Sequence, residues 1–224
     1  MNLPLLLVLG GFIGLDATSA PQLMISRPIV AATLSGLAFG HPAEGMLLGV
    51  ILEAFSLVIL PVGAAKYPES GTAAAAAAAA YASVAAPGLD APVLFLSAAF
   101  GLVWERVTGA TVTWVRRLNE RLVEWRPSPG RVVSREVERR HVAAMCADFL
   151  RGGLVTVVGA VAGAALIGIA APIWTLRAGA ALGIMFVGAA AMVAASLPLF
   201  GGWRERRLAF SLGILCGLLM VLFR

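Results

Sequence analysis

The sequence predicts an all-α integral membrane protein, a polytopic helical bundle in which several helices are short, re-entrant or broken. Of its 224 residues, 60% are hydrophobic and only 13% are charged, and the mean hydropathy is +0.91. A soluble domain of this size cannot bury so much apolar surface in its core, so the remainder must face lipid. Lipid admits helices or closed barrels, and these apolar stretches do not alternate with a period of two, which favours helices.

Apolar stretches of two lengths divide the chain. A helix needs roughly 20 residues to cross the hydrocarbon layer. The stretches that reach or approach this length are residues 45–65, 91–115, 152–171, 178–197 and 208–223, and the shorter ones are 1–15, 29–40 and 72–86. Short segments bounded by Pro and Gly are either tilted spans or re-entrant and broken helices, and the latter are tolerated where they line a protein-buried cavity. Because they cluster in the first 90 residues, we expect a transport site there.

Charge divides the chain into three expected regions. Residues 1–115 form a membrane region with the transport site, 116–151 a basic cytoplasmic helical arm, and 152–224 the C-terminal membrane helices. The arm is the one clearly water-exposed stretch, with nine Arg and five acidic residues around a Pro- and Gly-containing turn. The net charge is +5, and the positive-inside rule places the arm in the cytoplasm. Nucleic-acid binding is not favoured, because the arginines lie between apolar stretches.

The alanine run, the N-terminal apolar run and the two cysteines give predictions about structure and not about chemistry. Eight consecutive alanines at 73–80 predict a helix that packs closely against its neighbours, in preference to a direct role in transport. No basic stretch precedes the apolar run at 1–15, so we expect this run to be retained rather than cleaved. Cys146 and Cys216 lie far apart and indicate neither a disulfide framework nor a metal site, and no cofactor is expected.

Glu53 is the most informative single residue, because it lies eight residues into an otherwise uncharged apolar stretch. An acidic residue at the centre of a membrane helix costs about 2.5 to 3.5 kcal/mol on insertion scales, so it faces a cavity or a partner. The functional interpretation is a substrate-facing carboxylate. The structural one is a salt bridge or a protonated, hydrogen-bonded acid.

Other polar residues surround the Pro-bounded segments. Asp16 is either a helix cap or a substrate contact, and Gln22 has the donors and acceptors of a sugar ligand but suits a turn equally well. Arg27 either snorkels to headgroups or pairs with Asp16 or Glu53 at the mouth of the site.

Beyond the Glu53 stretch, Pro61 is expected to break the helix, so that the next polar residues emerge into water; these are Lys66, Glu69 and Ser70. His41 and His141 are interpreted as surface residues, and no arrangement of side chains indicates a self-contained active site.

A set of short motifs carries a family resemblance. In order, they are Leu15-Asp16, Arg27-Pro28 with an apolar run, a Gly-turn-Gly, Leu52-Glu53, and the PVGAA sequence at 61–65. Residues 15–71 thereby resemble the IIC subunit of the mannose/fructose/sorbose-type phosphotransferase permeases. A weaker match in the right order covers WVRRLNE at 114–120 and VERRHVAAMCADFLRGG at 137–153. Together these cover about two-thirds of the chain, and order and spacing carry the resemblance more than any one motif.

The resemblance implies a multi-pass subunit of the bacterial cytoplasmic (inner) membrane, with inverted repeats and re-entrant hairpins. Such subunits pair with a IID membrane subunit in the bilayer and assemble as trimers of IIC–IID heterodimers. They conduct a hexose from outside to the cytoplasmic IIB protein, which phosphorylates it with phosphate that comes from phosphoenolpyruvate through IIA. The phosphorylated histidines lie on IIA and IIB, so this chain would be a non-phosphorylated subunit without a cofactor.

By position, the resemblance makes Asp16, Gln22 and Glu53 sugar-facing groups and makes Arg27 the motif arginine. His41 in place of an acidic turn residue, and Pro61 where some mannose-type members have Asn, argue against mannose itself as the substrate. Two other functions stay open. One is a proton-coupled secondary transporter with Glu53 as the coupling acid, and the other is a non-transporting membrane scaffold or a regulatory remnant of a IIC subunit.

Overall fold

The computed structural model describes residues 1–19, 22–59, 67–123 and 134–222, and within these ranges all regular secondary structure is helical. The α-helices are α1 (Leu3–Thr18), α2 (Pro28–Ala38), α3 (Pro42–Ser56), α4 (Ser70–Val84), α5 (Ala91–Val123), α6 (Ser134–Ala170), α7 (Ala178–Ser196) and α8 (Gly202–Leu222). Short 3-10 helices, η1 (Ala171–Ile173) and η2 (Leu197–Phe200), follow α6 and α7. The all-α prediction is confirmed.

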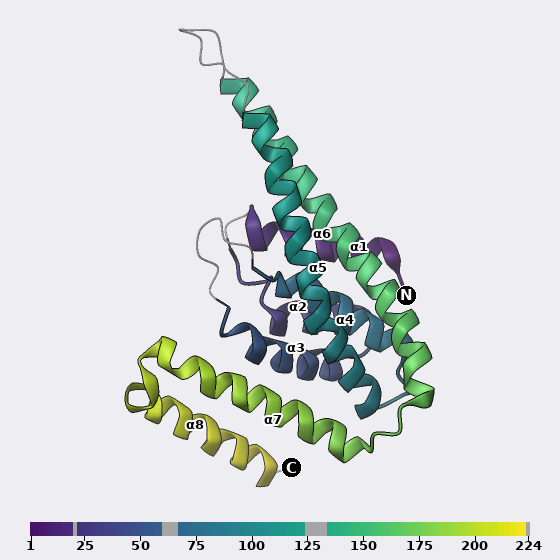
Figure 1. The fold of residues 1–224 in the computed structure, drawn as a ribbon, viewed down its shortest axis with the longest axis vertical. Coiled ribbons are helices and arrows are strands. Elements are labelled where there is room, and N and C mark those ends of the chain that lie inside the picture. The colour runs from purple at the N-terminus through teal and green to yellow at the C-terminus, as the bar shows by residue number, and fades with distance from the viewer. Residues whose placement is uncertain (20–21, 60–66, 124–133, 223–224) are drawn as a thin grey trace.

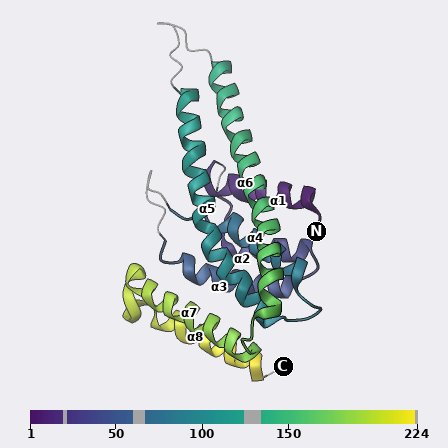
Figure 2. The ribbon, with the colours of Figure 1, turned by 45° about the vertical axis from the view of Figure 1, so that its right-hand side comes forward.

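Helices α5 and α6 form a long antiparallel pair that runs through the molecule and projects well beyond the rest of it (Figure 1). The two helices stay side by side in the rotated view, with α1 to α4 gathered around their lower half and the α7–α8 hairpin across their lower end (Figure 2). With 33 and 37 residues, they are about 50 and 55 Å long at 1.5 Å per residue. Because the hydrocarbon layer is only about 30 Å thick, part of the pair must lie outside it.

Only some of the helices are long enough to cross a membrane. By length and composition, the candidate spans within the described residues are Ala91–Arg121, Arg135–Ile173 and Ala178–Phe200. Helices α1 to α4 have 16 residues or fewer, about 24 Å at most. The predicted spans at 91–115, 152–171 and 178–197 are therefore confirmed as helical, and the prediction of short or broken helices in the first 90 residues is confirmed as well.

The predicted span at 45–65 is wrong, because α3 ends at Ser56 after 15 residues. The Ser56 hydroxyl donates to the carbonyl of Leu52, and Ile59 makes a turn back to Ser56. Residues 57–59 form a turn and not a further helical turn, so the chain has left the helical path before residue 60. The PVGAA sequence itself lies outside the described residues.

The alanine run is the centre of the bundle. All eight alanines of the run at 73–80 in α4 are at most 1% exposed, and α1, α2, α3, α5 and α6 all contact this helix. A hydroxyl of α2, that of Ser35, reaches the backbone of α4 and donates to the carbonyl of Ala75 at 2.8 Å. The predicted role of the run, close helix packing, is confirmed.

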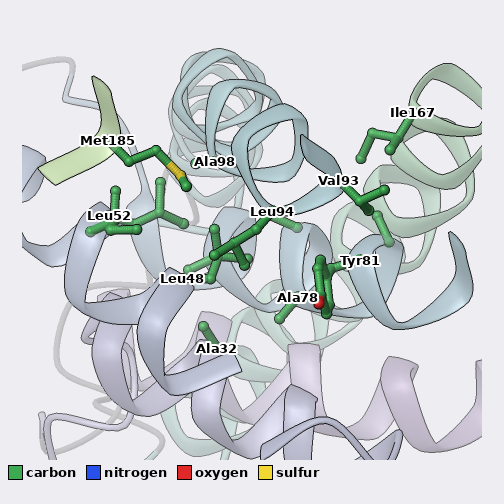
Figure 3. Close-up of a cluster of buried hydrophobic side chains, with 14 residues drawn as sticks. Ala32, Leu48, Leu52, Ala78, Tyr81, Val93, Leu94, Ala98, Ile167 and Met185 are labelled. Carbon is green, nitrogen blue, oxygen red and sulfur yellow. The ribbon is translucent and has the colours of Figure 1, made fainter. Parts of the chain in front are cut away.

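On one side of α4 lies the main apolar core (Figure 3). It joins Leu48 and Leu52 of α3 to residues from every later membrane helix up to α7; these are Tyr81, Val93, Leu94, Ala98, Ile167 and Met185. Alanines of α2, α4 and α5 belong to the same cluster, so large and small residues alternate in this core.

Glycines bring α1 and α6 into backbone contact. A Cβ added to Gly152 of α6 would lie 2.7 Å from the carbonyl oxygen of Gly10 and 2.9 Å from the Cα of Gly14. Gly10 and Gly14 are four residues apart and so share one face of α1, as in the small-xxx-small interfaces of membrane helices. Without a side chain at these positions, α1 can lie directly on α6.

The region predicted as a water-exposed basic arm, residues 116–151, is helical where it is described and forms the upper part of the α5–α6 pair. Arg135, Arg139 and His141 are exposed there, as expected. The prediction is wrong at the C-terminal end of this region, because Asp148 and Arg151 are buried in the bundle. They pair with each other, and Arg151 also pairs with Glu69, the residue that precedes α4. The Pro- and Gly-containing turn lies outside the described residues.

We expect Gly152→Ala to destabilise the protein by about 1 to 3 kcal/mol, because the new methyl group has no room between α1 and α6. Gly183→Ala in α7 is the matched control, because a Cβ there meets nothing within 4 Å. Replacing a glycine inside a helix by alanine stabilises the helix by up to about 1 kcal/mol. Thermal unfolding of both variants in one detergent should therefore move in opposite directions; a shared direction would contradict the close contact.

Candidate functional site

A cavity of about 440 Å³ opens where the short helices end. The C-terminal ends of α1 and α3 meet the N-terminal ends of α2 and α4 there, and α5 closes one side. The polar residues that line it are Asp16, Thr18, Gln22, Ser26, Arg27, Ser56, Tyr67, Glu69, Ser70 and Arg116. Helix ends leave backbone groups without partners inside the helix, so a place where four of them meet attracts polar side chains. Three of the four predicted site residues, Asp16, Gln22 and Arg27, line this cavity.

Asp16 holds the segment between α1 and α2 in place. Its carboxylate is 3% exposed and accepts hydrogen bonds from the backbone N–H groups of Leu23 and Ser26, the latter at 2.8 Å. Between these two anchors Met24 has a φ of +66°, a left-handed conformation that a residue with a side chain adopts at a cost of order 1 to 3 kcal/mol. The carboxylate therefore acts on the wall of the cavity, a role that neither the cap nor the direct-contact interpretation had described.

Arg27 and Glu53 form an ion pair beside the cavity. Arg27 lines the cavity, whereas Glu53 lies behind it with its side chain 16% exposed. The backbone N–H of Ile29, in the first turn of α2, also points at the Glu53 carboxylate at 3.4 Å, a place where the helix dipole favours an anion. The pairing that the sequence offered as one alternative for Arg27 is thus present, and direct contact of Glu53 with a substrate stays a prediction.

A buried ionic network lies under the cavity. The Arg151 guanidinium binds both oxygens of Glu69, at 2.6 and 3.0 Å, and its Nε donates to Asp148 at 2.8 Å. On the other side of Asp148, the hydroxyls of Thr18 and Ser19 donate to its second oxygen, Ser19 at 2.6 Å. The network ties the end of α1 and the start of α4 to α6.

Two predictions are corrected by this network. Glu69 was expected to emerge into water, but it is 3% exposed because Arg151 supplies a bidentate partner for its carboxylate. Ser70 is half-buried and lines the cavity, and Lys66 lies outside the described residues. Sequence reasoning missed the network because its members are up to 130 residues apart along the chain. The one available signal was an arginine directly before the apolar stretch at 152–171.

Arg116 is the other residue that sequence reasoning missed, since it was counted as part of the arm. Its guanidinium donates to the Tyr67 hydroxyl at 3.0 Å and lies 5.4 Å from the centre of the Tyr67 ring. A cation over an aromatic face is attracted by the ring's quadrupole. Tyr67 thereby fixes a positive charge on the wall of the cavity.

The histidines do not take part in this site. His41 begins α3 at the end of the α2–α3 hairpin that is remote from the cavity, and its ring packs edge-on against Tyr81. His141 is exposed on α6. Neither lines the cavity.

Comparison with known proteins gives the fold and nothing finer. No family model matches the chain, and no curated protein matches it. A solved structure described as "Structure of membrane protein" is similar over 99% of this chain and 94% of that one, with a TM-score of 0.69 and 17% sequence identity. This chain has the fold of a helical membrane protein. At that identity the likeness carries no function.

We expect Arg151→Gln to lower stability by about 3 to 5 kcal/mol, because it leaves two buried carboxylates without their counter-charge. Arg139→Gln on the same helix is the control, since Arg139 is exposed and its loss should change stability by less than about 0.5 kcal/mol. Thermal unfolding in detergent measures both. Equal stability of the two variants would mean that the network does not hold the bundle together.

Proposed function

We propose that the chain is the membrane-embedded, sugar-conducting IIC-type subunit of a phosphoenolpyruvate-dependent phosphotransferase system of the mannose/sorbose type. The observation that supports this most is the polar cavity at the ends of the short helices. It is lined by Asp16, Gln22 and Arg27, residues that the family resemblance marks as polar groups of the sugar site. Discontinuous helices whose ends meet at a cavity are a recurring way to build a transport site.

The chemistry of the cavity suits a sugar. Its volume of about 440 Å³ lies within the range of roughly 300 to 1,000 Å³ that is common for small-molecule sites. Gln22 offers both an acceptor and donors, and the hydroxyls of Ser56 and Ser70 add groups of both kinds. Sugar hydroxyls need such mixed partners, because each one both donates and accepts.

The position of the cavity suits phosphoryl transfer on the cytoplasmic side. Arg116 both lines the cavity and begins the basic arm, which the positive-inside rule places in the cytoplasm. In the proposed cycle, movement of α1 to α4 against the α5–α6 pair exposes the sugar to IIB. The phosphoryl group then passes from the IIB histidine to a sugar hydroxyl, and IIA restores it from phosphoenolpyruvate. The exposed arginines of the arm are a candidate docking surface for IIB or for anionic lipid headgroups.

The outer surface suits a IID partner and the bilayer of a bacterial inner membrane. Large apolar side chains of α7 and α8 are exposed, among them Val187, Leu208 and Leu212. A second, almost wholly apolar groove of about 540 Å³ lies between α5 and α6, with Trp104 and Trp114 along it. These faces support the assembly that the resemblance implies, a trimer of IIC–IID heterodimers in lipid.

We expect Glu53→Gln to weaken hexose binding by at least about tenfold, or 1.4 kcal/mol, because Arg27 loses the charge that holds it at the cavity. Binding is measured by calorimetry on the purified chain with its IID partner. Glu44→Gln is the control, because Glu44 lies on the same helix at its remote end, beside His41. Unchanged affinity in Glu53→Gln would remove Glu53 from the site.

Uptake of labelled sugar into vesicles should require phosphoenolpyruvate and the phosphate carriers, because the proposed subunit releases its sugar through phosphorylation. Uptake that instead follows a proton gradient and ignores the carriers would indicate a secondary transporter. Stable association with IID without any sugar binding would indicate a scaffold or a regulatory remnant.

A further inference from the structure

We infer that the cavity prefers a sugar that carries an anionic group, a carboxylate or a phosphate, and that Arg116 is the charge partner of that group. The inference rests on the proposed function and specifies the substrate class of the same site. It follows from an inventory of the charges around the cavity, in which every carboxylate already has partners and one guanidinium has no carboxylate.

The acids of the cavity are occupied. Both oxygens of Asp16 accept backbone N–H groups, and both oxygens of Glu69 are bound by Arg151. The third charged group, Arg27, is neutralised by Glu53. The three charged groups other than Arg116 that line the cavity, Asp16, Glu69 and Arg27, therefore already have hydrogen-bond or ionic partners within the protein.

Arg116 differs from them. Its partners are the hydroxyl and the ring of Tyr67, and no salt bridge to it occurs among the described residues. Residues 60–66, which precede Tyr67 and lie outside the described residues, contain no Asp or Glu and one Lys. The wall of the cavity at Arg116 thus has a positive charge that the protein does not balance.

The geometry of Arg116 suits an oxyanion better than a hydroxyl. A guanidinium carries five N–H donors in a planar fork that matches the oxygens of a carboxylate or a phosphate. One donor is used by the Tyr67 hydroxyl, and the Tyr67 ring lies within cation–π distance of the group. A donor group held in place before binding loses less entropy when the ligand arrives, and a partly buried charge is less screened than one in open water.

Two sources can supply the anionic group. A sugar acid brings a carboxylate with it, whereas a neutral hexose acquires a phosphate when the phosphoryl group is transferred. In both cases an oxyanion would lie beside Arg116. The two sources therefore share one chemistry, and an experiment distinguishes them.

The test compares glucose, glucuronate and glucose 6-phosphate by calorimetry on the full chain with its IID partner in detergent. We expect at least one anion to bind about tenfold or more tightly than glucose, since a hydrogen bond to a charged group is stronger than one between neutral groups. Preference for glucuronate identifies a sugar acid as the substrate, and preference for glucose 6-phosphate alone identifies the phosphorylated product.

Arg116→Gln should abolish the preference for the anion over glucose, and Arg116→Lys should retain part of it. Arg117→Gln is the matched control, because Arg117 is the exposed neighbour that does not line the cavity. Equal affinity for the three ligands, or an unchanged preference in Arg116→Gln, overturns this inference and leaves the proposed function standing. Failure of the unmodified protein to bind any of the three overturns both.

Discussion

The fold depends on α4, a helix whose side chains are mostly methyl groups. Because α4 consists largely of alanine, five other helices can approach its backbone closely, and the bundle closes around it. Close approach is also the reason for the glycines at the α1–α6 contact. In lipid there is no hydrophobic force between apolar helices, so such contacts draw on dispersion between closely fitted backbones. Larger residues along α4 would separate the neighbouring helices and with them the helix ends that form the cavity.

Short helices that end inside a bundle leave polar groups there without partners, and the ionic network supplies partners for some of these groups. The ends of α1 and α4 bring unsatisfied backbone groups and carboxylates into the bundle, where an unpaired charge is expensive. Arg151 pairs with two carboxylates, those of Glu69 and Asp148, and the hydroxyls of Thr18 and Ser19 donate hydrogen bonds to Asp148. Replacing one member at a time is therefore costly, although the whole set adds little stability over an apolar core of the same shape. Its value lies in fixing how the helix ends meet.

The sequence predicts the class of fold well, because hydropathy and the absence of a period of two depend on each segment alone. The same holds for the alanine run and for the stretches at 152–171 and 178–197. The site is predicted in part: Asp16, Gln22 and Arg27 converge on one cavity, and Arg27 pairs with Glu53. The rest depends on residues brought together from distant segments, such as Arg151 with Glu69 and Arg116 with Tyr67. Neither spacing nor periodicity contains that information, and α3 ends at Ser56, earlier than hydropathy alone indicates.

Helix α6 is continuous from Ser134 to Ala170, so its exposed upper part and the guanidinium of Arg151 belong to one stiff rod. The Arg151 guanidinium is the counter-charge of Glu69, the residue that immediately precedes the alanine-rich helix α4. The exposed upper part of the α5–α6 pair and the floor of the cavity are thus mechanically coupled through one uninterrupted helix.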